Sequence, residues 1–73
     1  MQNDDIQAPS KLRAWLRREG RRNGWLADQC QVNPATLTRW LTGKSVPQAI
    51  YRGVLERITE GAVMAEDWER RER

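Results

Sequence analysis

Apolar residues along this chain recur at the three- and four-residue spacing of helix faces. Over NPATLTRWLTGK, residues 33–44, Leu37, Trp40 and Leu41 fall at i, i+3 and i+4. This spacing predicts a helix over 34–42 with one side turned toward a core.

Capping residues define both ends of that helix. Asn33 is a favourable N-cap, Pro34 suits the first helical position, and Gly43 suits the residue just past the last turn. The side opposite the apolar residues offers small or hydroxyl-bearing side chains and one cation. Its members are Ala35, Thr36, Thr38, Arg39 and Thr42.

Further apolar segments predict helices on either side of it. SKLRAWLRREG begins with Ser10 as N-cap and ends at Gly20. Another helix follows Pro47 and ends at Gly61, and MAEDWERRER after it predicts a short amphipathic helix. The residues expected to face inward are Leu12, Trp15 and Leu16 in the first helix, and Ile50, Val54, Leu55 and Ile58 in the later one.

The segment WLADQC, with Asn23 as its N-cap, predicts a helix directly before 34–42, and only residues 31–33 connect the two. Helices joined so closely cross at a steep angle. Such a crossing needs a small residue where the helices meet, which Ala27 supplies. It also needs an apolar side chain beneath the turn, which Val32 supplies. The sequence therefore predicts a helix-turn-helix unit.

No stretch alternates as a half-buried strand would, so the expected fold is all-α, a compact four- to five-helix bundle. Residues 1–9 are expected to form a flexible arm, 10–68 the helix-turn-helix domain, and 69–73 a charged tail. The tryptophans Trp15 and Trp40 are expected to pack in the core, with Trp25 half exposed.

Composition indicates in which cellular compartment the protein is expected. No apolar run approaches the ~20 residues of a membrane span, and the acidic start MQNDDIQAPS has no apolar signal core. The single cysteine, Cys30, shares a face with Leu26, which indicates a core position in a reducing environment. We therefore expect a cytoplasmic protein.

Positive charge is concentrated in the middle of the chain. Residues 11–52 hold nine basic and two acidic residues, a net charge of +7, whereas residues 53–73 carry a net charge of −2. A surface that binds a polyanion requires such an excess, although a solvated arginine-rich surface has the same composition.

The polar side of helix 34–42 has the chemistry of a DNA-contacting surface. A helix enters the major groove, about 12 Å wide, when its leading side is slim, as Ala35 and the threonines would make it. Arg39, at the centre of that side, can bond O6 and N7 of a guanine. Lys44, just past the helix, is placed for a phosphate.

Each of these residues can also have an ordinary structural or solvent-exposed role without any contact to DNA. Asn33 can cap its helix without touching an adenine, and Arg39 can be a solvated surface arginine. At the start of the preceding helix, Arg21, Arg22 and Asn23 lie where unpaired N–H groups attract a phosphate.

The stretch NGWLADQCQVNPATLTRWLTGKSVP resembles the helix-turn-helix of the Cro and phage-repressor (XRE-type) superfamily, whose fold is lambda-repressor-like. The following AIYRGVLERITEGAVMAEDW is similar to the end of small Cro-like and YdaS-like prophage regulators. The family usually has glycine at the turn position held here by Gln31, and glutamine at that of Asn23. The resemblance implies base contacts by Asn33, Ala35, Thr36 and Arg39, and phosphate contacts by Asn23, Thr38, Thr42 and Lys44.

The resemblance also implies a homodimer that binds an operator and represses transcription; Val63, Met64 and Trp68 are candidates for its interface. The alternative is a protein-interaction module, such as an antitoxin or adaptor, with the same helical fold. RNA binding is less favoured, because the chain lacks phenylalanine and a predicted sheet. With no histidine, one cysteine and no phosphate-cradling glycine loop, we expect no enzymatic activity, no metal and no cofactor.

Overall fold

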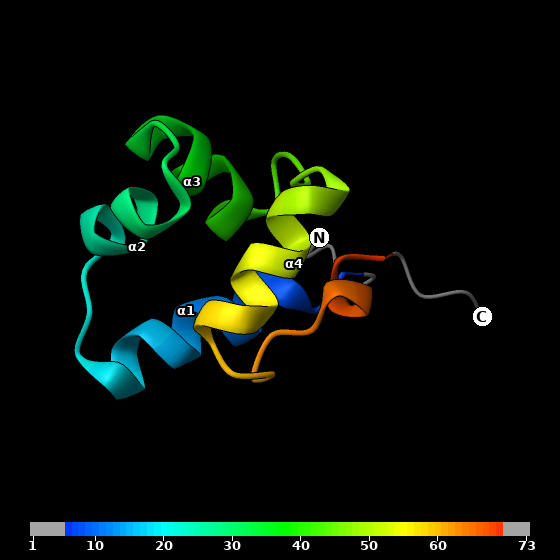
Figure 1. Cartoon of the computed structure of the whole chain (residues 1–73), viewed down its shortest axis with the longest axis horizontal. Coiled ribbons are helices and arrows are strands. Elements are labelled where there is room, and N and C mark those ends of the chain that lie inside the picture. The colour runs from blue at the N-terminus through cyan, green and yellow to red at the C-terminus, as the bar shows by residue number, and fades with distance from the viewer. Residues whose placement is uncertain (1–5, 70–73) are drawn as a thin grey trace.

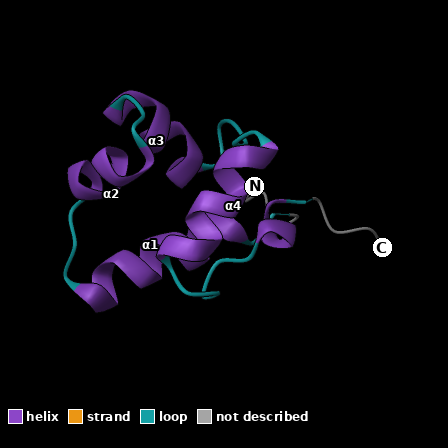
Figure 2. Cartoon of the chain, viewed as in Figure 1, coloured by secondary structure: helices purple, strands orange, loops and turns teal. Residues whose placement is uncertain are grey.

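A computed structural model describes residues 6–69 of the chain (Figure 1). Four α-helices are followed by one short 3-10 helix, and no strand occurs in this described range (Figure 2). The all-α bundle is therefore confirmed. The elements are α1 (Ala8–Glu19), α2 (Asn23–Cys30), α3 (Pro34–Thr42), α4 (Ala49–Ile58) and η1 (Ala65–Trp68).

The first helix begins earlier than the sequence predicts. Gln7 is its N-cap, and Ser10 lies inside the first turn, where its hydroxyl donates to the Gln7 carbonyl at 3.2 Å. Pro9 is tolerated there because N–H groups of the first turn have no intrahelical acceptor. The prediction of Ser10 as N-cap was wrong. The predicted arm over 1–9 is wrong for Ala8 and Pro9, which are buried in α1, and residues 1–5 lie outside the described range.

One apolar core joins all the helices. α3 packs against α1 and α2, α4 packs against α2, and η1 packs against α1 and α4. In Figure 1, α2 and α3 form the upper part of the molecule and α1 the lower part. The largest fully buried side chains are Trp68, Leu12, Leu26, Leu37, Leu55, Val63 and Pro47.

Only residues 31–33 connect α2 to α3, as the sequence predicts. Gln31 adopts the left-handed conformation, with φ 59° and ψ 45°, and Val32 N donates to the Ala27 carbonyl at 3.0 Å. Ala27 is buried at the crossing, and Val32 packs against the core. Arg22 is the N-cap of α2, so the prediction that Asn23 caps this helix was wrong; Asn23 is its first residue.

The orientation of α4 differs from the expected one. Leu55 is buried and the Tyr51 ring lies 5.5 Å from that of Trp40, whereas Ile50 is 70% exposed. The prediction that Ile50 faces inward was wrong, because Tyr51 and Leu55 determine which side of α4 meets the core. The helix also ends three residues before Gly61: Thr59 is its C-cap and donates its hydroxyl to the Leu55 carbonyl at 2.8 Å.

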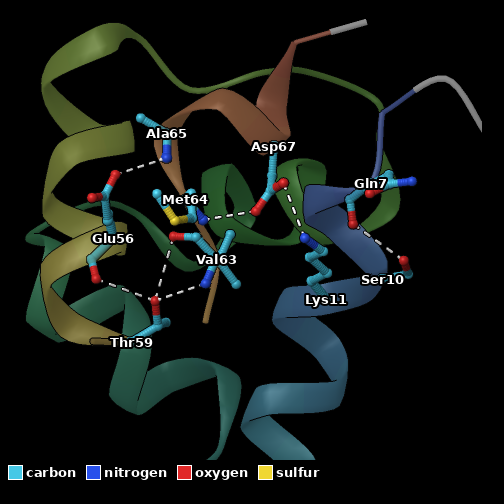
Figure 3. A network of polar contacts seen from close by, with 9 residues as sticks. All are labelled: Gln7, Ser10, Lys11, Glu56, Thr59, Val63, Met64, Ala65 and Asp67. Atoms are coloured by element: carbon cyan, nitrogen blue, oxygen red, sulfur yellow. Dashed lines mark hydrogen bonds and ion pairs between the residues drawn. The ribbon is translucent and has the colours of Figure 1, made fainter. Parts of the chain in front are cut away.

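The C-terminal segment, residues 63–68, completes the core and is held in place by hydrogen bonds and one ion pair (Figure 3). Asp67 accepts hydrogen bonds from Met64 N at 2.8 Å and from the Lys11 ammonium at 3.0 Å. Val63 and Trp68 are 0% and 2% exposed. They pack inside their own chain, so of the three residues expected at a dimer surface only Met64, which is 39% exposed, remains accessible. The predicted amphipathic helix shortens to η1, and residues 70–73 lie outside the described range.

Among residues 6–69, every helix is too short or too polar to span a bilayer.

Candidate nucleic-acid interface

The outward side of α3 is open to solvent, as the sequence predicts. Leu37, Trp40 and Leu41 are buried beneath the helix. The opposite side is exposed at Ala35, Thr38, Arg39 and Thr42, and Thr36 lies half-buried at its edge. The helix therefore separates a core side from a slim, polar outer side.

The ends of α3 have the predicted caps. Asn33 Oδ1 accepts a hydrogen bond from Ala35 N at 2.8 Å. Because this oxygen is engaged, the exposed carboxamide retains its Nδ2 donors for an outside acceptor. At the other end Gly43 adopts φ 79°, a left-handed conformation that glycine takes without a steric cost, and the chain turns away toward Lys44.

The hydroxyls of Thr38 and Thr42 already have partners within the helix. Thr38 Oγ1 donates to the Pro34 carbonyl at 3.1 Å, and Thr42 Oγ1 donates to the Thr38 carbonyl at 2.9 Å. A hydroxyl carries one hydrogen, so in this geometry each threonine offers only a methyl group and acceptor lone pairs. That chemistry suits a thymine methyl or a base amino group better than a phosphate, which needs donors.

Arg39 and Lys44 are the cations of this surface. Both are exposed, and within residues 6–69 neither has a carboxylate oxygen within 4.0 Å. The Lys44 backbone N–H donates to the Arg39 carbonyl at 2.9 Å, which connects the loop to the last turn of α3. An unpaired arginine in the centre and an unpaired lysine at the end remain available to an anion.

The three predicted phosphate-binding residues at the start of α2 are all exposed, but Arg21 differs from the other two in its contacts. Arg22 and Asn23 are exposed. The Arg21 guanidinium lies 4.4 Å from the Trp25 ring centroid, and both residues line a cleft that also contains Ile58 near the end of α4. Arg21 is therefore held on an aromatic ring instead of lying free beside Arg22. The spacing of four residues between Arg21 and Trp25 was a signal for this contact.

Arg13 is a functional candidate that the sequence did not indicate. Its guanidinium donates to the Leu41 carbonyl, one of the last carbonyls of α3. The contact links α1 to the C-terminal end of α3, across 28 residues of sequence. No local pattern marks such a long-range partner.

Outside the α3 surface, chemical reactivity concerns the thiol of Cys30 and the residue types that could hold a metal ion. Cys30 is buried, as predicted, and burial raises the pKa of its thiol from 9.0 to about 11, which makes it a poor nucleophile at neutral pH. Residues 6–69 contain no group of three or more histidine, cysteine, aspartate or glutamate side chains arranged to hold a metal ion.

No protein-family model matches the chain, and no curated protein or solved structure matches it. The function of the α3 surface is accordingly inferred from its own side chains.

Proposed function

We propose that this chain is a sequence-specific double-stranded DNA-binding transcriptional regulator, a repressor of phage or prophage type that acts as a homodimer on an operator. The observation that carries the proposal is the outer side of α3, which is exposed, slim and centred on the unpaired Arg39.

The dimensions of α3 suit the major groove. Nine residues make a helix about 14 Å long, enough to contact a few successive base pairs in a groove about 12 Å wide. Ala35 adds only a methyl group to the leading side, so the backbone can approach the base edges closely. A bulky aromatic or long aliphatic residue there would hold the helix away from them.

Each exposed side chain has a matching group on DNA. Arg39 can donate two hydrogen bonds to O6 and N7 of one guanine, and the Thr38 and Thr42 methyl groups can contact thymine methyls. Asn33 can donate Nδ2 to a base acceptor. Lys44 beyond the helix and Arg22 at the start of α2 can bind phosphates on either side, which fixes orientation without sequence preference.

A protein-interaction module is the second candidate, favoured by the exposed Ile50 on α4. Such a module would bind a partner without a salt-dependent affinity for DNA. The two candidates therefore predict different results in one titration, because phosphate contacts release counterions and make DNA binding weaken steeply with salt.

The test is selection of duplexes from a random library, followed by anisotropy titrations of the selected duplex and of a random one. Arg39→Ala should lose about 1–3 kcal/mol of discrimination, roughly 5- to 150-fold, on the selected duplex only. Arg17→Ala is the matched control, since it removes one exposed arginine from α1. Equal losses on both duplexes, or no salt-sensitive binding by the wild type, would contradict the proposal.

A further inference from the structure

An apolar stripe runs along one flank of α4, beside the side that packs against the core. Ile50 is 70% exposed and Val46, just before the helix, is 38% exposed. Val54, at the inner edge of the stripe, is half-buried and packs partly against the core, whereas a Cβ at Gly53 would meet nothing within 4 Å. Isoleucine is among the residues most often buried in proteins. Ile50 instead lies exposed at the edge of a shallow groove along α4.

The charges beside this stripe argue against a membrane as the partner. Interfacial helices carry lysine and arginine on the polar side, which anionic lipids attract. The groove along α4 is instead bordered by Glu56, Arg57 and Glu60. Two carboxylates and one guanidinium give this border a net negative charge, which an anionic lipid surface would repel.

We propose that a second copy of this chain covers the α4 stripe, defined as Val46, Ile50, Gly53, Val54 and Arg57, when both copies are bound to DNA. This inference rests on the function proposed above. It replaces the expected interface through Val63 and Trp68, which are buried inside their own chain.

The stripe has the features that a self-complementary interface needs. In a two-fold dimer the same surface meets itself, so it must carry both signs of charge. Arg57 lies between Glu56 and Glu60 in sequence and beside both in the groove. A two-fold axis that crosses the end of α4 brings the cation of one copy near a carboxylate of the other. Gly53 lets the two backbones approach.

The position of the stripe also suits two DNA half-sites. Val46 follows the end of α3 by four residues, so an interface there lies next to the C-terminal end of each α3. Dimeric helix-turn-helix proteins place their two recognition helices about 34 Å apart, one turn of DNA. A single nine-residue helix contacts too few base pairs to select one site, and a second copy doubles the number.

The small area of the stripe predicts that the dimer is weak without DNA. Stable interfaces bury about 1,200–2,000 Å² in total, whereas α4 is about 15 Å long and offers few exposed apolar side chains. Two copies on adjacent half-sites face each other at a high effective concentration, which raises avidity by about 10²-fold or more. We therefore expect a monomer in dilute solution and cooperative assembly on the operator.

Three variants with no change of charge test the inference. Ile50→Gln removes the apolar anchor. Gly53→Gln fills the centre of the stripe and should fold, because a Cβ there meets nothing in the monomer and glutamine favours helix more than glycine. Met64→Gln is the matched control, since Met64 is also exposed, at 39%, but lies outside the stripe.

The first measurement is binding to the selected duplex and to a duplex that carries one half-site. The wild type and Met64→Gln should bind the full site cooperatively, with two copies per duplex. Ile50→Gln and Gly53→Gln should bind the half-site like the wild type and lose about 10²-fold on the full site. Wild-type binding to the full site as one copy, or unchanged cooperativity in both stripe variants, would overturn the inference while the proposed function stands.

The second measurement needs no DNA. Amide chemical shifts of the wild type are followed on dilution from about 1 mM to about 20 μM, a range that detects association with a Kd near 1 mM. Shifts confined to residues 46–57 in the wild type, and abolished by Gly53→Gln, support the stripe as the interface. If no shifts occur there, the inference is overturned, whether or not the protein binds DNA.

Discussion

Replacement of Gln31 by glycine should stabilise the protein. Gln31 lies in the turn between α2 and α3 at φ 59° and ψ 45°, where an L-residue crowds its own Cβ against the following carbonyl. Its side chain is exposed and forms no hydrogen bond in the described part of the chain. The substitution therefore removes strain without removing a contact, and the backbone bonds from Gln31 N and Val32 N remain.

The expected gain follows from two opposing terms. The left-handed conformation costs about 1–2 kcal/mol for a residue other than glycine, and glycine makes the unfolded chain more flexible by about 0.5–1 kcal/mol. The difference is a net stabilisation of about 0.5–1 kcal/mol. For a domain of this size that corresponds to a rise in Tm of about 2–8 °C.

The assay is thermal unfolding monitored by circular dichroism, with urea titrations to obtain the free energy of unfolding. Gln29→Gly is the matched control, because Gln29 is also exposed but lies inside α2, where glycine costs about 1 kcal/mol. The two identical replacements, two positions apart, should change the Tm in opposite directions. If Gln31→Gly lowers the Tm as Gln29→Gly does, the turn is not left-handed at Gln31 and the reasoning is refuted.

Three other predictions concern charge and ionisation. Lys44→Ala should weaken binding to selected and random duplexes alike and reduce the salt slope by about 0.9, the contribution of one phosphate contact; an unchanged slope in anisotropy titrations argues against that contact. Asp67→Ala should cost about 1–2 kcal/mol of unfolding free energy, because it leaves Met64 N without its acceptor. Lys11→Ala should cost at most about 0.5 kcal/mol of unfolding free energy, since the ion pair between Lys11 and Asp67 is partly exposed. If urea titrations give the same loss for Lys11→Ala as for Asp67→Ala, the Met64 N–H bond is not the larger contribution. Burial raises the pKa of the Cys30 thiol from its unfolded value of 9.0 to about 11. Between these two pH values the folded state keeps a proton that the unfolded state releases, so the free energy of unfolding should fall as the pH rises from 9 to 11. Cys30→Ala should show a smaller fall between pH 9 and 11, and an identical fall would exclude Cys30 as the cause.

The parts of the fold set by neighbouring residues were predictable from sequence. Asn33, Pro34 and Gly43 determine where α3 begins and ends, and the structure confirms both bounds. Gln31 adopts the left-handed conformation at the turn position where the pattern that the chain resembles usually has glycine. These features depend on contacts within four or five residues, which the order of residue types specifies directly.

Features set by distant partners could not be predicted in this way. The apolar residues of α4 form more than one possible stripe, and only the contact between Tyr51 and Trp40 selects the side that faces inward and leaves Ile50 outside. The hydrogen bond from Arg13 to the Leu41 carbonyl, and the burial of Trp68 at the far end of the chain, likewise depend on tertiary packing.

The residues that form the proposed DNA surface were predictable, but the hydrogen bonds and ring contacts of their side chains were not. The sequence placed Arg39, Thr38 and Thr42 on one side of a helix, and the structure places them there. It could not indicate that the threonine hydroxyls are bonded inside the helix, or that Arg21 is held on the Trp25 ring.

The late position of Val63 and Trp68 has a consequence for synthesis of the protein. Both side chains belong to the same buried core as Leu12 of α1. A growing chain that has emerged only through α3 already carries the residues proposed to contact DNA, but it lacks the last part of the apolar core. Products that terminate early should therefore stay open and be degraded by cellular proteases, so that only chains translated at least through Trp68 compete for DNA.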